Sequence, residues 1–367
     1  MIAPTLLFLV GLVVLILGAD LLVRGASRLA ASFGVSPLMI GLTIVAIGTA
    51  SPEIAVSIQA AANGQADLTL GNVLGSNIFN ILFILGLTAL VAPIMIAEQL
   101  IRKDAPIMLG VSLLTFGLAF DGTLGLFDGF ILLAGLVGYI VYALRQSKLE
   151  SAAVQNEYAQ EFSQKEPRST RNILINLLWI VVGLGLLVLG SNLLVDSATQ
   201  IARQFGVSEL LIGLTIVAVG TSLPEVATSV IAALKGESDI AVGNVVGSNI
   251  FNLLGVLGLG AVVAPSGVAV NAHVLQFDLP VMVFVALVTL PIFYIDNRIS
   301  RLEGGLLFSY YGLYLTYLIL QAVAALILPV FTPAAMLFLL ITFSIVLVTA
   351  IRSVNRKGNG TNNRDIA

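Results

Sequence analysis

The sequence predicts an all-α polytopic membrane protein, built from two inverted five-helix repeats and an extra C-terminal transmembrane helix. The composition, the length of the apolar runs and an internal repeat lead to this fold class. Of the 367 residues, 58% are hydrophobic and only 10% are charged, whereas soluble domains carry about 25% charged residues. Several apolar runs exceed the roughly 18 residues that are needed to cross a bilayer as a helix.

Glycine, proline and charged residues divide the apolar sequence into about eleven spans. The first span lacks a basic leader, so we expect it to be a retained helix and not a cleaved signal. The chain has no cysteine, which excludes disulfides and thiolate metal sites. The predicted spans are 5–27, 37–62, 68–92, 105–120, 126–145, 172–198, 209–233, 240–264, 277–295, 303–322 and 328–351.

Lysine and arginine fall almost entirely on one side when the loops alternate across these spans. Sixteen lie on that side, and only Arg203 lies on the other. Because cytoplasmic loops carry the excess of basic residues, we expect the N-terminus outside and the C-terminus inside. We also expect a polar cytosolic linker at 146–171 and a disordered cytosolic tail at 352–367.

The chain repeats itself with a single offset of 172 residues. Residues 33–53 match residues 205–225 at 16 of 21 positions, and residues 71–80 match residues 243–252 at 9 of 10. Each repeat holds five spans, and this odd number turns the second copy upside down in the membrane. Inverted repeats with a binding site at their interface are typical of secondary transporters. The predicted divisions are a first repeat at 1–145 with its motif at 41–80, a second repeat at 172–322 with its motif at 213–252, and an additional helix at 323–351.

A proline lies inside one apolar span of each repeat, at Pro52 and Pro224. Proline removes a helical N–H and clashes with the carbonyl group four residues earlier. Those carbonyl groups belong to Gly48 and Gly220. We expect both to be exposed at membrane depth, where a cation can bind them.

A glutamate follows each proline, at Glu53 and Glu225. An acidic residue inside a span costs about 2.5–3.5 kcal/mol on insertion, so it indicates a functional site. One such glutamate could be a helix–helix hydrogen-bond partner, but two at equivalent positions favour an ion site. Helical spacing places other oxygen-bearing groups on the same faces, or on the next helix. These groups belong to Ala46, Thr49, Ser76, Asn80, Ala218, Thr221, Ser248 and Asn252.

This set of oxygen groups favours Ca²⁺ or Na⁺ over zinc or copper, and the sole histidine, His273, is expected in a loop without a metal-binding partner. Asp20 and Arg24 are four residues apart and predict a local ion pair. Four asparagines either bond across helices or face the site, namely Asn72, Asn77, Asn244 and Asn249. Four aspartates at span ends are expected to be solvated, namely Asp104, Asp121, Asp278 and Asp296.

The paired GT-x-x-PE and GN-x-x-GSNIFN segments resemble the α-repeats of the cation/calcium exchanger superfamily, especially its prokaryotic sodium/calcium exchangers. The resemblance covers about residues 1–322. It implies that the central cation ligands are Glu53, Asn80, Glu225 and Asn252, and that the first and sixth spans slide over a fixed eight-helix core. The flanking ligands that it implies are Thr49, Ser76, Ala46, Thr221, Ser222, Ser248 and Ala218, the alanines through their carbonyl groups.

Two positions depart from the family pattern. Ala50 stands where the second repeat has the hydroxyl group of Ser222. Asn252 occupies a position that is often aspartate in sodium/calcium exchangers, and in this it resembles proton-coupled members of the superfamily. Two carboxylates still balance one Ca²⁺ or two monovalent cations.

The predicted function is therefore that of an antiporter, not an enzyme. It exchanges Ca²⁺ for Na⁺ across the inner or plasma membrane by alternating access, for calcium extrusion. The alternatives are Ca²⁺/H⁺ exchange and a gated cation channel, of which the inverted repeat disfavours the channel. The expected partners are Ca²⁺, Na⁺ or H⁺ and the lipid bilayer, with no cofactor, no nucleic acid and no required protein partner.

Overall fold

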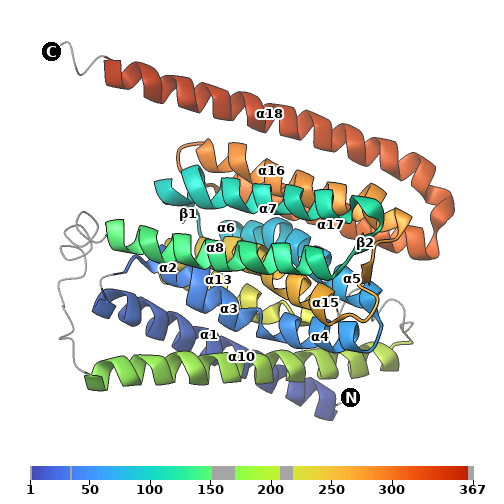
Figure 1. Cartoon of the computed structure of the whole chain (residues 1–367), viewed down its shortest axis with the longest axis horizontal. Coiled ribbons are helices and arrows are strands. Elements are labelled where there is room, and N and C mark those ends of the chain that lie inside the picture. The colour runs from blue at the N-terminus through green and yellow to red at the C-terminus, as the bar shows by residue number, and fades with distance from the viewer. Residues whose placement is uncertain (1, 34, 151–169, 207–217, 363–367) are drawn as a thin grey trace.

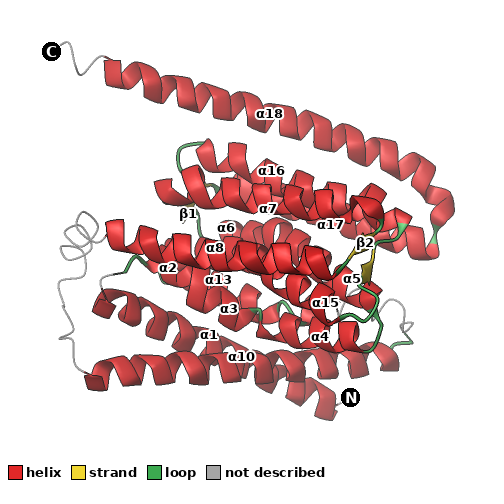
Figure 2. Cartoon of the chain, viewed as in Figure 1, coloured by secondary structure: helices red, strands yellow, loops and turns green. Residues whose placement is uncertain are grey.

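A computed structural model describes residues 2–33, 35–150, 170–206 and 218–362 of the chain. Helices make up nearly all of this described part, and the few strands are two residues long (Figure 2). The all-α architecture predicted from the apolar runs is therefore confirmed.

The first repeat consists of five consecutive helical units, several of which contain a π-helical turn. In chain order they are α1 (Ile2–Phe33); α2 (Pro37–Ile40), the π turn η1 (Gly41–Val45), α3 (Ala46–Thr49) and α4 (Ser51–Ala62); α5 (Ala66–Phe79), the π turn η2 (Asn80–Leu85) and α6 (Gly86–Val91); the π turn η3 (Leu100–Asp104), α7 (Ala105–Leu118) and the 3₁₀ turn η4 (Ala119–Asp121); and α8 (Leu126–Glu150).

The second repeat follows the same order, with residues 207–217 outside the described part. Its elements are α10 (Thr170–Gln204); α12 (Ala218–Gly220) and α13 (Leu223–Leu234); α14 (Ser238–Phe251), the π turn η6 (Asn252–Val256) and α15 (Leu257–Val263); the π turn η7 (Val274–Asp278) and α16 (Leu279–Tyr294); and α17 (Arg301–Val323), which the 3₁₀ turn η8 (Ala325–Ile327) connects to α18 (Leu328–Asn362).

Eight helices of the described chain are long and apolar enough to cross a membrane. A further candidate is the pair Pro37–Thr49 and Ser51–Ala62, which is bent by 47°. Every predicted span contains at least one helix of the structure, although part of the span at 209–233 lies outside the described residues. The chain is thus a multi-pass membrane protein, while the count of eleven spans and the orientation stay predictions.

The contact between α1 and α10 shows the inversion of the two repeats. These helices lie side by side (Figure 1). A Cβ atom on Gly18 would lie 2.8 Å from the carbonyl oxygen of Gly183, and one on Gly190 would lie 2.9 Å from the carbonyl oxygen of Gly11. The helices are therefore antiparallel and in backbone contact. Because Gly11 and Gly18 precede Gly183 and Gly190 by the same 172 residues, the contact is self-complementary, as across a two-fold axis.

Four short strands repeat the same symmetry. They are β1 (Ile94–Met95), β2 (Thr123–Leu124), β3 (Val268–Ala269) and β4 (Arg298–Ile299). β1 pairs with β4 and β2 pairs with β3, so each antiparallel pair joins the first repeat to the second. β1 and β2 lie toward opposite ends of the molecule (Figure 1). The strand pairs thus tie the two repeats together at both ends of the bundle.

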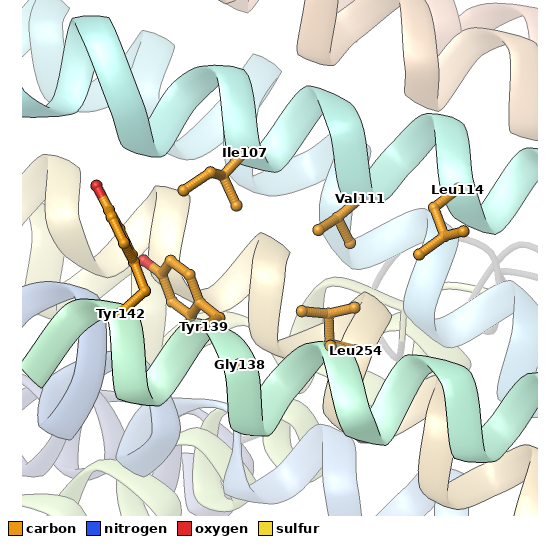
Figure 3. Close-up of a pocket in the computed structure, with 8 residues that line it drawn as sticks. Ile107, Val111, Leu114, Gly138, Tyr139, Tyr142 and Leu254 are labelled. Carbon is orange, nitrogen blue, oxygen red and sulfur yellow. The ribbon is translucent and has the colours of Figure 1, made fainter.

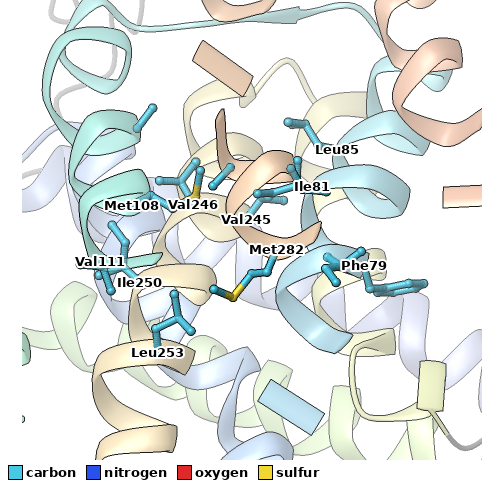
Figure 4. Packing of buried hydrophobic residues seen from close by; sticks show 14 of the residues in the cluster. Phe79, Ile81, Leu85, Met108, Val111, Val245, Val246, Ile250, Leu253 and Met282 are labelled. Atoms are coloured by element: carbon cyan, nitrogen blue, oxygen red, sulfur yellow. The ribbon is translucent and has the colours of Figure 1, made fainter. Parts of the chain in front are cut away.

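Buried apolar side chains form two separate clusters. The larger one joins α5, α7, α14 and α16 and includes Phe79, Met108, Val245 and Met282 (Figure 4). The smaller one joins α1 and α10 to α13 and includes Leu22, Leu187 and Ala227. The smaller cluster therefore joins the α1–α10 pair to α13 and to buried residues of α2, η1 and α14, apart from the larger cluster.

α18 packs against α16 and α17, outside the two repeats. The hydroxyl groups of Tyr310 and Thr342 lie 2.7 Å apart. The helix continues to Asn362, so the prediction of a disordered tail from 352 is wrong for the residues up to that point. The hydroxyl of Ser353 donates to Asp296 Oδ1 at 3.2 Å, and this bond fixes the helix beyond the predicted span. The central part of the predicted linker, 151–169, lies outside the described residues.

Candidate functional site

A break in the helix precedes each of the two predicted glutamates. Ala50 separates α3 from α4 with φ −75° and ψ 3°, and Ser222 occupies the equivalent position with φ −90° and ψ 7°. Pro52 and Pro224 lie in the first turn of the following helix, where a missing N–H costs no hydrogen bond. The break predicted from the prolines is therefore present in both repeats.

The carbonyl groups four residues before the prolines are bound by hydroxyl groups, contrary to the prediction that they are exposed for a cation. The Ser51 hydroxyl donates to the carbonyl oxygen of Gly48. The Ser191 hydroxyl, on α10, donates to the carbonyl oxygen of Gly220 at 2.6 Å. These carbonyl groups therefore do not require a cation. Ser191 is 29 residues away in the chain from its acceptor, and no sequence pattern indicates such a contact.

Glu53 and Glu225 are both buried, each with 1% of its surface exposed. Both lie in the first turn of their helices, where the N–H groups favour a negative charge. Glu53 Oε1 accepts a hydrogen bond from the Ser222 hydroxyl at 3.0 Å, and this hydroxyl lies 3.4 Å from the hydroxyl oxygen of Ser76. Since Ser222 belongs to the second repeat, the two breaks meet at this point.

Asn80 and Asn252 each begin a π-helical turn, η2 and η6. Such turns inside α-helices are frequent at functional sites. The amide nitrogen of Asn80 donates to Asn249 Oδ1 at 3.0 Å, and Asn249 in turn donates to the carbonyl oxygen of Asn77 at 3.3 Å. The amide oxygens of Asn80 and Asn252 are buried and have no hydrogen-bond partner. The structure thus leaves the oxygen atoms of both predicted ligands available.

Asn72 and Asn244 are two of the four asparagines that were expected either to bond across helices or to face the site. Both bond across helices, to the helices that carry the glutamates. The amide nitrogen of Asn72 donates to Ser57 Oγ at 2.9 Å and to the carbonyl oxygen of Glu53 at 3.4 Å. Asn244 makes the equivalent two bonds in the second repeat, at 3.0 and 3.4 Å. Ser57 and its equivalent Ser229 were not among the predicted residues. Their separation by the repeat offset of 172 is the signal that identifies them.

Each threonine of the two breaks lies beside the glutamate of the other repeat. Thr49 is next to Glu225, and its hydroxyl donates to Asn244 Oδ1 at 3.0 Å. Thr221 is next to Glu53, but its hydroxyl makes no hydrogen bond of good geometry. Each glutamate therefore has a threonine hydroxyl group of the other repeat beside it, so the two repeats build the predicted site together.

The carbonyl group of Ala46, one of the two alanines predicted as carbonyl ligands, is already bound within its own helix. The Ala46 carbonyl accepts from the Ala50 N–H at 3.0 Å and from the Thr49 hydroxyl at 3.4 Å. The N–H of Ser222, which is equivalent to that of Ala50, donates to the carbonyl of Val219 at 3.1 Å. The N–H group at the break therefore donates four residues back in the first repeat and three residues back in the second.

Six oxygen atoms of the predicted ligand residues are buried and have no hydrogen-bond partner among the described residues. Leaving one buried polar atom unpaired costs about 1–3 kcal/mol, so these atoms need a bound ion or water to pair with. A cation binds carboxylate, amide and hydroxyl oxygens together, and Ca²⁺ takes about six to eight of them. The atoms are Glu53 Oε2, Asn80 Oδ1, Thr221 Oγ1, Glu225 Oε2, Ser248 Oγ and Asn252 Oδ1.

The chemistry of these donors favours a hard cation. In the part of the chain that the structure describes, no group of three or more His, Cys, Asp or Glu could hold a metal ion. Two carboxylates with neutral oxygens suit Ca²⁺ or Na⁺ better than a transition metal. The sole histidine, His273, lies in a helical turn and not in a loop, 3.8 Å from the half-buried Asp278.

The aspartates at the span ends fall into two groups. Asp121 and Asp296 are exposed, as predicted. Asp104 has only 1% of its surface exposed, so the prediction of a solvated side chain is wrong there. Its Oδ2 accepts a hydrogen bond from Gln99 at 3.3 Å, and this neighbour offsets part of the cost of burial.

An apolar cavity of about 250 Å³ lies between α7 and α8 (Figure 3). Ile107 and Val111 face it from α7, and Tyr139 and Tyr142 stand together at one end of it on α8. None of the predicted ligands is among the residues that line it. This cavity is therefore not the site that the sequence predicts.

Known proteins with the same sequence pattern are transporters. Residues 3–145 and 175–320 match the family described as sodium/calcium exchanger protein. The chain is 44% identical over 312 residues to CaxA of Alkalimonas amylolytica, which is named as a candidate antiporter, with 84% of this chain and 96% of the relative covered. It is 33% identical over 346 residues to the sodium/calcium exchanger MaX1 of Methanosarcina acetivorans, with 85% and 97% covered.

A solved structure shows the same architecture. The sodium-calcium exchanger NCX_Mj, soaked with zero Na⁺ and Ca²⁺, matches with a TM-score of 0.74 and 30% sequence identity. The match covers 86% of this chain and 99% of that chain. Both the fold and the family resemblance given by the sequence motifs are therefore confirmed.

Proposed function

The chain belongs to the sodium/calcium exchanger family, and from this premise we propose that it exchanges cytosolic Ca²⁺ for external Na⁺ across the inner or plasma membrane. The exchange proceeds by alternating access and serves calcium extrusion. Members of this family are membrane transporters, and Ca²⁺ and Na⁺ are their substrates. An inward Na⁺ gradient would then drive Ca²⁺ outward.

The cation site of this proposal is centred on Glu53, Glu225, Asn80 and Asn252. The observation that carries it is the group of unpaired buried oxygen atoms around the two helix breaks. Two carboxylates balance the charge of one Ca²⁺ or of two Na⁺, so the two ions can replace each other. The remaining proposed ligands are Thr49, Ser76, Thr221, Ser222, Ser248, Ala46 and Ala218.

Alternating access requires one part of the protein to move past another. The two-cluster core supports this, because the buried side chains of α1 and α10 belong to the smaller cluster, so the pair can shift without disrupting the larger one. The glutamates stay in the main body, and the moving pair exposes them to one side at a time. A cavity open to both sides at once would dissipate the ion gradients.

Proton coupling is the second candidate, and Asn252 is the residue that favours it. With an amide at this position the site holds two carboxylates and not three. A proton can neutralise a buried carboxylate that no cation balances. In this alternative, protons take the place of Na⁺ at Glu53 and Glu225, and Ca²⁺ transport follows the pH gradient.

Uptake of ⁴⁵Ca²⁺ into proteoliposomes separates the two candidates. Under the proposal, Ca²⁺ accumulates in vesicles loaded with Na⁺ and diluted into Na⁺-free buffer, but not under a pH gradient without Na⁺. Accumulation under the pH gradient alone would contradict Na⁺ coupling and support the second candidate. Accumulation that needs neither gradient would contradict both candidates and indicate a channel.

Three glutamate variants test the site in the same assay. Glu53→Gln and Glu225→Gln should each abolish uptake, because each leaves a single carboxylate for a divalent ion. Glu98→Gln is the matched control, since Glu98 is exposed and pairs with Arg102 at 2.7 Å on the surface. Near-normal uptake by either site variant would contradict the proposed ligands.

A further inference from the structure

The α1–α10 pair covers one of the glutamate helices and leaves the equivalent helix open. α1 packs along α13, where Thr228 is 0% exposed. In the described chain α10 has no comparable packing against α4, and Val56, the equivalent of Thr228, is 44% exposed. Likewise Ala227 is buried and its equivalent Ala55 is exposed. The structure therefore shows one of two states that the symmetry of the repeats allows.

Two polar contacts fasten α1 to the turn that follows α13. The ammonium group of Lys235 lies 2.5 Å from Asp20 Oδ1 and donates to the Asp20 carbonyl oxygen at 3.3 Å. Arg24 Nε lies 2.8 Å from the other carboxylate oxygen, which confirms the predicted local ion pair. Two helical turns along α1, the Ser27 hydroxyl donates to Glu237 Oε1 at 2.8 Å. Both contacts exist because α1 lies against α13.

The equivalent positions at the other end of the molecule carry no ion pair. Asn192 and Asn63 stand where the aspartate and the lysine would be, and Thr199 and Gln65 replace the second contact. The backbones of the two turns are alike, since the glycines at their centres have φ of 74° and 81°. The two ends therefore differ in side-chain charge and not in backbone form.

We propose that Asp20, Lys235, Ser27 and Glu237 form a latch that favours the state in which α1 covers α13. This inference rests on the alternating-access part of the proposed function, because movement of α1 and α10 toward α4 would break the latch. In the opposite state, in which α10 covers α4, the neutral side chains of Asn192 and Asn63 would face each other and would form no ion pair. A contact that exists in one state only shifts the equilibrium toward that state.

The latch determines to which side of the membrane the resting transporter is open. With the predicted N-out orientation, the turn after α13 lies at the cytosolic face. The latched state is then closed to the cytosol, and the uncovered helix α4 lies on the external side. In the resting protein the site would thus be accessible to external Na⁺. Cytosolic Ca²⁺ would bind only after the latch opens.

Single cysteines can report the position of α1, because the natural chain contains none. Ala227→Cys reports on the covered face of α13, and Ala55→Cys reports on the open face of α4. Proteoliposomes are treated with a hydrophilic maleimide on both sides of the membrane, and labelling rates are compared with and without Asp20→Asn or Lys235→Gln. Each latch substitution should speed labelling of Ala227→Cys about two- to fivefold, as expected for a partly exposed ion pair, and should slow labelling of Ala55→Cys.

Moving the ion pair to the other end should reverse the effect. Asn63→Lys combined with Asn192→Asp supplies the missing pair at the equivalent position and should slow labelling of Ala55→Cys. Arg102→Gln removes a surface ion pair elsewhere and should change neither rate. Unchanged labelling in the latch variants, with or without a lower unfolding temperature, would overturn the latch and leave the contacts a purely structural role.

The labelling assay does not depend on ion transport, so the two proposals can fail separately. Normal Na⁺-driven Ca²⁺ uptake with unchanged labelling rates would overturn the latch alone. The predicted labelling changes without Na⁺-driven uptake would contradict the proposed ion coupling and support the latch.

Discussion

At the scale of single residues, Ser222 joins the two repeats at the proposed site. Its hydroxyl donates to Glu53 Oε1 at 3.0 Å, whereas the equivalent Ala50 has no hydroxyl to offer. Ser222→Ala removes a hydroxyl group that is also one of the proposed cation ligands, and the loss of one such polar contact costs about 1–3 kcal/mol of binding free energy. We therefore expect the Ca²⁺ concentration for half-maximal uptake to rise about tenfold.

The matched change in the first repeat is Ala50→Ser, which adds a hydroxyl at the equivalent position. It should leave the half-saturating Ca²⁺ concentration unchanged or lower it. If Ser222→Ala shows the same concentration dependence as the unmodified protein, the hydrogen bond to Glu53 has no role in ion binding.

Glu237, which lies between two spans, gives the protein a pH dependence. Burial raises the pKa of its carboxyl group above the ordinary value of 4.5, and Asp239 acts in the same direction, while Ser27 and Lys235 lower the pKa. The folded state thus binds this proton more tightly than the unfolded state. The contribution of Glu237 to stability is then full below pH 4.5 and is lost as the pH rises through the raised pKa.

Glu237→Gln should remove this loss, because glutamine does not titrate and can still accept a hydrogen bond from Ser27. Between pH 4.5 and neutral pH, the unfolding temperature of the variant in detergent should fall less than that of the unmodified protein. Parallel curves for the two proteins would show that Glu237 titrates alike in the folded and unfolded states.

At the scale of helices, the α1–α10 contact depends on glycine. A Cβ on Gly18 would meet backbone atoms of α10, at 2.7 Å from Leu187 N and 2.8 Å from the Gly183 oxygen. Gly18→Val should therefore push the helices apart and destabilise the protein by about 1–3 kcal/mol, measured by thermal unfolding in detergent. Gly185→Val on α10 is the control, because a Cβ there meets nothing within 4 Å. Equal effects of the two substitutions would contradict the close contact.

The helix breaks show which features of the helices could be predicted from the sequence. The prolines and the 172-residue repeat were sufficient to predict both breaks and to place Glu53 and Glu225 after them. The donor to the Gly220 carbonyl could not be predicted, because Ser191 belongs to another helix and carries no pattern of its own. Asp104 was predicted to be solvated because it lies at a span end, but tertiary packing buries it.

The difference in exposure between α4 and α13 could not be predicted from the sequence, for another reason. The two helices occupy equivalent positions in the repeats, and α1 packs against α13 while no comparable contact covers α4 among the described residues. A sequence that allows two states does not indicate which of them a structure shows. The pairs Asp20–Lys235 and Ser27–Glu237, whose equivalents at the other end are uncharged, are the sequence features that favour a side.

At the scale of the whole molecule, α18 lies outside the two repeats. The family match ends at residue 320, and α18 packs on the outer side of α16 and α17. Deletion of residues 324–367 should therefore preserve Na⁺-driven Ca²⁺ uptake while lowering the unfolding temperature. Loss of uptake in a truncated protein that still purifies as a folded species would show that α18 takes part in transport.

The position of a bound divalent ion tests the central claim most directly. Anomalous scattering from crystals soaked in Sr²⁺, a hard ion similar to Ca²⁺, would locate it. The account predicts one peak between the two helix breaks, about 2.6 Å from at least one carboxylate oxygen of Glu53 and of Glu225. A peak beside Asp104 or Asp278, with none in contact with both glutamates, would contradict it.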